Sequence, residues 1–247
     1  MPHLDGAITV SRVSFVRGLG IAAIAGAFDP ARNAAFASAA FTQPNADEAW
    51  GRLSAGNKRY ASDKGINCGD NFDRRLALAS GQRPFAIVLA CADSRVAPEL
   101  VFDQRVGDIF VVRVAGNIAD TASLGSIEYA VSHFAPRLLV VMGHEKCGAV
   151  EAAVAAIEGK VHLTGHVAEI VEQIEPAARS AMAQSGDLLN NAIAANVRLV
   201  VAKLRASAPV IQPAVAAGDL RVIGVRYALG SGVVSTVSTS GAGAAAI

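Results

Sequence analysis

The chain has 247 residues, of which 52% are hydrophobic and 17% are charged, a composition that supports a large core and excludes an intrinsically disordered protein. Its 22 basic and 21 acidic side chains give a net charge of +1, which argues against a protein built to bind nucleic acid. Three cysteines are too few for a disulfide scaffold of this length. Because a domain has about 150 residues, one large or two small domains fit the chain.

Residues 1–39 have the layout of a secretory signal. An apolar stretch at residues 18–28 follows two arginines and precedes the small-residue sequence 37–39, which resembles a cleavage site. Residues 11–17 resemble a twin-arginine export signal in which Val13 stands at the place of the second arginine. This segment predicts export to the periplasm, and the alternative is an N-terminal helix on a cytoplasmic protein. No apolar run in the sequence reaches the roughly 18 residues that span a membrane.

Residues 44–238 read as one domain of alternating helices and strands. Asn45 and Glu48 have the spacing of a capping box and predict a helix over residues 46–61, followed by a short helix near 73–80. Four apolar runs have the length of strands and lack alternation, as expected for strands covered on both faces. These runs are residues 85–90, 109–114, 138–142 and 220–225, and helical patterns occupy residues 123–134, 149–158, 167–182 and 188–206.

The order of these elements predicts an α/β fold with a central, mainly parallel sheet flanked by helices. Strands that alternate with helices form right-handed βαβ units, which place the strands parallel to one another. Residues 222–237 read as two strands joined by a turn, and we expect this C-terminal pair at the edge of the sheet. The small residues of 239–247 are expected to fray.

Two of the predicted strands are followed by side chains that bind metals. Cys91 comes directly after the first strand, His144 lies two residues beyond the third, and Cys147 follows three residues later. Ligands of open parallel sheets bind beyond the carboxyl ends of the strands, so these side chains should meet at one edge. Two thiolates and an imidazole favour zinc, and three protein ligands are typical of a catalytic site. The sequence therefore predicts one catalytic Zn²⁺ per chain.

The motifs around these residues resemble those of the β-class carbonic anhydrases. They are Cys-Ala-Asp-Ser-Arg at residues 91–95 and Gly-His-Glu-Lys-Cys-Gly at residues 143–148, and the resemblance extends over roughly residues 50–237. It implies that Cys91, His144 and Cys147 are the zinc ligands. It also implies a lyase that reversibly hydrates CO2 to bicarbonate and a proton by attack of zinc-bound hydroxide.

The resemblance implies a catalytic role for Asp93 and Arg95. Asp93 would accept a hydrogen bond from the zinc-bound hydroxide and aim it at the carbon of CO2. Arg95 would keep Asp93 ionised and, through a two-pronged contact, turned away from the metal. If that pairing fails, Asp93 itself becomes the fourth zinc ligand and the site is closed. A tryptophan that accompanies a regulatory bicarbonate pocket in part of the family is replaced here by Val88, so we expect an open site at neutral pH.

Four further residues match positions that line the substrate pocket of the family. Gln82 matches a hydrogen-bond donor, while Phe110, Ala115 and Tyr129 match apolar positions, of which Tyr129 is supplied by the neighbouring subunit in relatives. An apolar pocket with one donor suits CO2, a small uncharged molecule. Because relatives are dimers or larger, the resemblance implies a homodimer or a homotetramer whose small-molecule partner is CO2 or bicarbonate.

Other interpretations of the same residues stay open. The scaffold and metal would also suit the hydrolysis of carbonyl sulfide or carbon disulfide. A further alternative is a non-catalytic protein in which zinc only stabilises the scaffold. Cys68 has no matching partner and is interpreted as a surface or half-buried thiol. His162 and His166 stand four residues apart, but no further soft ligand accompanies them, so we interpret them as a solvated helix start.

Overall fold

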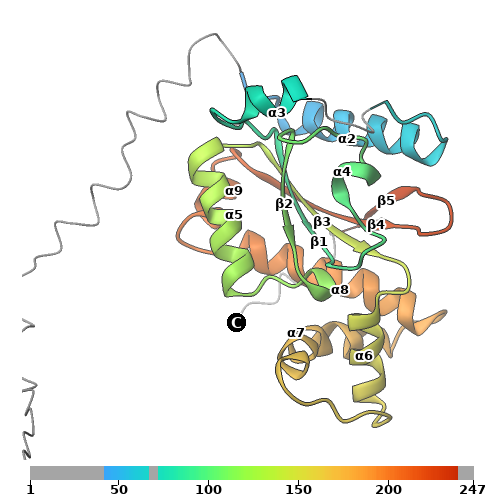
Figure 1. Cartoon of the computed structure of the whole chain (residues 1–247). Helices are drawn as coiled ribbons and strands as arrows, with labels where there is room; N and C mark the ends of the chain where they lie inside the picture. Colours follow the sequence, from blue (N-terminus) through green and yellow to red (C-terminus); the bar gives the residue numbers. More distant parts are fainter. Residues whose placement is uncertain (1–41, 67–71, 239–247) are drawn as a thin grey trace, which may run out of the picture. The chain divides into compact units, whose positions relative to one another are not determined.

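The structure is a computed structural model that describes residues 42–66 and 72–238 (Figure 1). Three sequence predictions lie outside the described residues: the export signal at 1–39, the thiol of Cys68 and the fraying tail at 239–247. None of the helices within the described ranges is long and apolar enough to cross a membrane.

The described strands form one five-stranded sheet in the order β2-β1-β3-β4-β5. The strands β1 to β4 run parallel to one another, and β5 pairs with β4 in the antiparallel direction. The predicted α/β class, the mainly parallel sheet and the C-terminal strand pair at its edge are therefore confirmed. The strands are β1 (Ala86–Ala90), β2 (Ile109–Arg113), β3 (Leu138–His144), β4 (Arg221–Tyr227) and β5 (Val234–Val237).

The helices agree with the predicted pattern except where they are short. The long ones are α2 (Ala46–Ala61), α5 (Thr121–Phe134), α6 (Gly148–Ile157), α7 (His166–Ala181) and α8 (Leu188–Arg205). The helix expected near residues 73–80 is α3 (Phe72–Leu78). The sequence analysis missed α4 (Pro98–Val101), the 3-10 turn η2 (Ala115–Asn117) and α9 (Ile211–Ala216). Elements this short carry too few residues for a helical period to be visible in the sequence.

The start of α2 has the capping box that the sequence predicts. Oδ1 of Asn45 accepts hydrogen bonds from the backbone N–H of Asp47 at 3.0 Å and of Glu48 at 2.9 Å. In return, the Glu48 carboxylate accepts the backbone N–H of Asn45 at 2.9 Å. These bonds satisfy N–H groups that the first turn of a helix leaves without a partner.

Both faces of the central strands are buried, as their unbroken apolar runs predict. Val88 and Val140 face the core layer that includes Leu53 of α2 and Val101 of α4. Ile87 and Leu139, the residues just before these on each strand, belong to the opposite core layer, which α5, α8 and α9 cover. A third apolar cluster, formed by α6, α7 and α8, includes Cys91 and Cys147.

The third strand extends further than its apolar run. The sequence analysis ended this strand at Met142, but β3 continues through Gly143 to His144. The pairing partners of these two residues on β4 are Arg226 and Tyr227. Because this register holds His144 in the sheet, its backbone position is set by strand pairing rather than by a loop.

The N-terminal cap of α5 gives a testable contribution to stability. Oδ1 of Asp120 accepts the backbone N–H of Ser123 at 2.8 Å, and this bond lowers the pKa of the Asp120 carboxyl. Asp120→Ala should lower the free energy of unfolding by about 1 kcal/mol at neutral pH. A carboxyl whose pKa is depressed by folding stabilises above its unfolded pKa of about 3.9 and loses that contribution as the pH falls through the folded pKa. Urea unfolding of the wild type and of Asp120→Ala between about pH 7 and about pH 3 tests this prediction. A difference in the free energy of unfolding that stays constant over this range would contradict it.

Candidate metal centre

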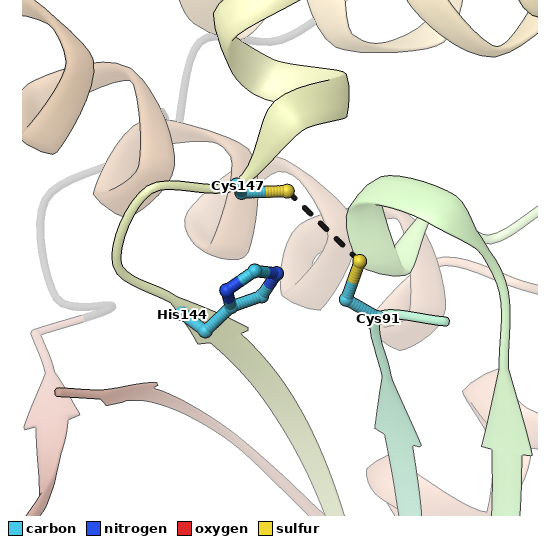
Figure 2. Close-up of side chains that lie close together, drawn as sticks. All are labelled: Cys91, His144 and Cys147. Atoms are coloured by element: carbon cyan, nitrogen blue, oxygen red, sulfur yellow. Dashed lines mark hydrogen bonds between the residues drawn. The ribbon is translucent and has the colours of Figure 1, made fainter. Parts of the chain in front are cut away.

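Three metal-binding side chains converge at the carboxyl ends of β1 and β3 (Figure 2). Cys91 follows the last residue of β1, His144 ends β3, and Cys147 is the N-cap of α6. One ligand atom from each lies within 4.8 Å of the others, and all three residues are buried. The prediction that strand ends would bring Cys91, His144 and Cys147 together therefore agrees with the structure.

The imidazole of His144 is oriented for metal binding by the residue that follows it. Nδ1 of His144 lies 2.8 Å from the carbonyl oxygen of Glu145. A carbonyl oxygen accepts only, so Nδ1 is the nitrogen that donates, and Nε2 is the nitrogen left to bind a metal through its lone pair. Nε2 is buried without a hydrogen-bond partner among the described residues, and the ring lies beside both sulfur atoms in Figure 2. A buried imidazole nitrogen that has no hydrogen-bond partner in the described part of the chain and lies beside two thiols fits a metal ligand.

The two sulfur atoms lie at a separation that suits one shared zinc ion. Sγ of Cys91 and Sγ of Cys147 are 4.0 Å apart, and two sulfurs each bound to a tetrahedral zinc at about 2.3 Å lie about 3.8 Å apart. The hydrogen bond from the Cys147 thiol holds the pKa of Cys91 below its usual value, and the same bond raises the pKa of Cys147. Because zinc binds thiolates, metal binding releases the protons that the two sulfur atoms still carry.

Asp93 and Arg95 form a two-pronged ion pair beside the ligands. Nε of Arg95 donates to Oδ1 of Asp93 at 2.9 Å, and Nη2 donates to Oδ2 at 2.7 Å. The backbone N–H of Arg95 adds a third bond, to Oδ1, at 3.0 Å. The Arg95 side chain, through these bonds, holds the pKa of Asp93 far below its ordinary value. The carboxylate is therefore ionised, and both of its oxygens are bound to Arg95.

Arg113, at the end of β2, secures the loop that carries these residues. Its Nε donates to the carbonyl oxygen of Cys91 at 2.9 Å, and its Nη2 donates to the carbonyl oxygen of Asp93 at 2.5 Å. The sequence analysis assigned Arg113 no role. The register could have indicated one, because Arg113 pairs with Ala90, the residue before Cys91.

Comparison with known proteins agrees with this geometry. The family model for carbonic anhydrase matches residues 86–234. The chain is 41% identical to carbonic anhydrase 2 of Mycobacterium tuberculosis over 184 residues, which cover 74% of this chain and 89% of that protein. It is also 40% identical to a carbonic anhydrase of Mycolicibacterium smegmatis over 194 residues, covering 78% and 94% of the two chains. The chain belongs to the β-carbonic anhydrase family of enzymes.

Solved β-carbonic anhydrases share the fold of this chain. A tetrameric β-carbonic anhydrase from Sordaria macrospora superposes with a TM-score of 0.61 and 25% identity, covering 78% of this chain and 93% of that one. A β-carbonic anhydrase from Aspergillus fumigatus has a TM-score of 0.60 and 28% identity, covering 75% and 89%. The resemblance seen in the two sequence motifs therefore extends to the fold of about three quarters of the chain.

Only part of the pocket expected from the β-carbonic anhydrase family lies at the metal centre of the single chain. Ala115 begins η2, and the backbone N–H of the next residue, Gly116, donates to Sγ of Cys91 at 3.3 Å. Gln82, by contrast, is exposed and precedes β1, whereas the candidate ligand Cys91 follows it. The five residues of β1 lie between Gln82 and Cys91, and each strand residue adds about 3.3 Å to their separation. Gln82 thus lies toward the opposite edge of the sheet from the metal ligands of the same chain.

Phe110 and Tyr129 lie together, in an aromatic cluster beside α5. The ring centroids of Phe110 and Tyr129 are 6.4 Å apart, and Tyr129 stacks on His133 with centroids 4.0 Å apart. Phe110 packs in the core layer under α5, which is a different cluster from the one that holds Cys91 and Cys147. Tyr129 is 44% exposed. The single chain therefore presents Tyr129 at its surface and does not direct it into its own metal centre.

Gly143 lets α8 pack closely against the strand that carries His144. A Cβ at Gly143 would lie 2.6 Å from Cγ2 of Val197 in α8. Gly143→Ala is expected to lower the free energy of unfolding by about 1–3 kcal/mol, because an added methyl group overpacks a buried contact. Zinc affinity should fall as well, since the displaced strand carries His144. Gly148→Ala is the matched control beside Cys147, because no atom lies within 4 Å of its added Cβ. Equal unfolding energies for the two variants would contradict this account.

Proposed function

We propose that the chain catalyses the zinc-dependent, reversible hydration of CO2 to bicarbonate and a proton. The observation that carries this proposal is the buried Cys91–His144–Cys147 cluster with an ionised carboxylate, Asp93, held two residues from the first ligand. Three protein ligands leave a fourth position for water in catalytic zinc sites. A purely structural site would have no use for the adjoining carboxylate–guanidinium pair.

Cys91, His144 and Cys147 would hold the zinc ion. When bound, zinc supplies Lewis acidity, which makes water a nucleophile near neutral pH. The chain tunes that acidity through its own groups: the Glu145 carbonyl orients His144, and the Gly116 N–H draws electron density from the Cys91 sulfur. Apolar neighbours of the two cysteines, including Ile118 and Val150, keep the surroundings poor in water.

Asp93 would orient the nucleophile. Its carboxylate can accept a hydrogen bond from the attacking oxygen and so direct a lone pair at the carbon of CO2. Arg95 contributes by holding the carboxylate ionised and by binding both of its oxygens, which opposes rotation of Asp93 toward the metal ligands. These two residues thus position a group rather than transfer a proton themselves.

The pocket would be completed by a second copy of the chain, as a homodimer or a homotetramer. Gln82 and Tyr129, which match pocket residues of the family, lie away from the metal ligands of their own chain, and both are exposed. Exposed residues of one copy can reach the site of another across a symmetric interface. The tetrameric Sordaria macrospora enzyme is a precedent for such an assembly. The Gln82→Ala variant should then sediment as the same oligomer as the wild type. Its rate of CO2 hydration, measured by stopped flow, should be lower.

Stopped-flow measurement of CO2 hydration, with zinc counted in the same sample, tests the proposed activity. We expect CO2 hydration at neutral pH with about one zinc per chain. The measurement runs from about pH 6.5 to about pH 9, because this range brackets the pKa of about 7 that catalytic zinc gives its bound water. Hydration that appears only at alkaline pH would indicate that Asp93 closes the site. Zinc without any hydration would overturn the proposal and direct attention to carbonyl sulfide and carbon disulfide, and inactivity toward these would favour the scaffold.

Export of the chain is a separate proposal that rests on its sequence. Residues 1–39 combine arginines, an apolar stretch and a small-residue cleavage sequence. The mass of the chain recovered from the periplasm of its host should then correspond to a protein that has lost this segment. A full-length chain confined to the cytoplasm would contradict the proposal.

A further inference from the structure

A buried asparagine of α8 reaches the metal centre through one intervening residue. Asn196 is 1% exposed, and its Nδ2 donates to the carbonyl oxygen of Gly116 at 2.8 Å. The N–H of the same glycine donates to Sγ of Cys91 at 3.3 Å. A chain of two buried hydrogen bonds therefore joins helix α8, which supplies no ligand, to the sulfur that would bind the metal.

Gly116 is held in this orientation by its backbone conformation and its surroundings. Its φ of +68° and ψ of 15° lie in the left-handed region, where glycine meets no steric penalty. A Cβ at this position would lie 2.5 Å from Cδ1 of Ile174 and 3.2 Å from Cβ of Ala149. The residue thus fits closely under α6 and α7, and Asn196 provides the hydrogen bond that fixes its carbonyl.

The hydrogen bond to sulfur has a consequence for a metal centre of this composition. Two thiolates neutralise the charge of a divalent ion and so weaken its action as a Lewis acid. An N–H directed at one of the sulfurs withdraws electron density from it and restores part of that acidity. The strength of this effect depends on how well the N–H is aimed, which makes the anchor of Gly116 important.

We propose that Asn196 is a positioning residue that acts through Gly116 to keep a backbone N–H directed at the Cys91 sulfur, and thereby sets the electron density of that metal ligand. The inference rests on the proposed function only in taking Cys91 as a ligand. The hydrogen bonds that link Asn196 to the Cys91 sulfur run through the Gly116 peptide groups, so Asn196 acts on that sulfur indirectly.

The test uses Co²⁺ loaded in place of zinc, because Co²⁺ binds nitrogen and sulfur ligands and has a thiolate-to-metal charge-transfer band. Asn196→Leu keeps the number and branching of the side-chain heavy atoms but has no hydrogen-bond donor, and Asn196→Ala is a second variant in case the first does not fold. In both, the band should move to longer wavelength, because a sulfur without its N–H partner is more electron-rich. Zinc affinity, measured by competition with a chelator, should fall about 10-fold to 100-fold, the usual effect of removing an outer-shell partner.

Asn57→Leu is the matched control, because Asn57 is a buried asparagine that serves the fold. It is 5% exposed and donates to the carbonyl oxygens of Val101 and Gly232, at 3.0 and 2.8 Å. This variant should melt at a lower temperature but keep the wild-type band and zinc affinity. A wild-type band in both folded Asn196 variants, or an equal shift in the Asn57 variant, would overturn the proposal. Wild-type chain that binds Co²⁺ but never hydrates CO2 would refute only the proposed function, since the band comparison would still decide the role of Asn196.

Discussion

Replacing Cys147 with serine is expected to abolish stable zinc binding. Cys147 is the N-cap of α6 and brings its sulfur to 4.0 Å from that of Cys91, so its loss removes one of the three ligands. Loss of an outer-shell partner costs up to about 100-fold in metal affinity, and loss of a ligand should cost more than that. At a zinc concentration of about 100 times the dissociation constant, binding stabilises the native state by about 2.7 kcal/mol. The variant should lose this stabilisation, seen as a lower melting temperature in the presence of zinc.

The control for this prediction is Cys68→Ser, which changes a thiol that the sequence analysis does not count among the ligands. That variant should bind about one zinc per chain and melt as the wild type does. Chelator added to the wild type should lower its melting temperature to that of Cys147→Ser, because both treatments remove the same metal. If Cys147→Ser retained stoichiometric zinc and normal melting, Cys147 would not be a ligand.

Asp93→Asn should keep zinc bound but lower the rate of CO2 hydration by about 100-fold. A loss of this size is expected when a reacting group is no longer held in the correct orientation. The amide replaces one carboxylate oxygen with a donor and removes the charge that Arg95 binds through two bonds of 2.9 and 2.7 Å. The side chain can then no longer accept hydrogen bonds with both of its terminal atoms. Stopped-flow hydration with zinc counted in the same sample measures both quantities.

Asp108→Asn is the matched control for the loss of an aspartate–arginine pair. Asp108 binds Nη2 of Arg74 at 2.7 Å, so the same substitution removes a comparable ion pair between α3 and the segment before β2. This variant should hydrate CO2 at the wild-type rate even if it is slightly less stable. Equal turnover for Asp93→Asn and Asp108→Asn would refute the orienting role of Asp93.

Local patterns were sufficient to predict which side chains converge at the carboxyl ends of β1 and β3. Unbroken apolar runs identified β1 and β3, and the parallel arrangement required Cys91 and His144 to meet at one edge. The spacing of His144 and Cys147 added the third side chain of the cluster, and the pairing of Asp93 with Arg95 followed within the loop after Cys91. These inferences succeeded because strand direction and short loops are set by neighbouring residues along the chain.

The supports of the site depended on contacts between residues that are far apart in the sequence. Arg113 binds the carbonyls of Cys91 and Asp93, and Asn196 lies 80 residues beyond the glycine that it anchors. No periodicity or motif predicts which buried asparagine meets which carbonyl, because that choice depends on how α8 packs across the sheet. The position of Gln82 is a similar case, since its motif suggested a pocket residue without indicating that β1 carries it away from Cys91.

The sequence by itself thus determined the fold class, the order of most strands and helices, and which three side chains converge at the candidate metal centre. These depend on hydrophobic periodicity, strand ends and short spacings, which are local properties of the chain. Only the tertiary structure decided the orientation of the His144 ring, the N–H directed at Cys91 and the separation of Tyr129 from the metal ligands. The physical reason is that hydrogen bonds and close contacts between distant segments exist only after helices and sheet have packed, and side-chain packing selects among the partners that the local patterns leave open.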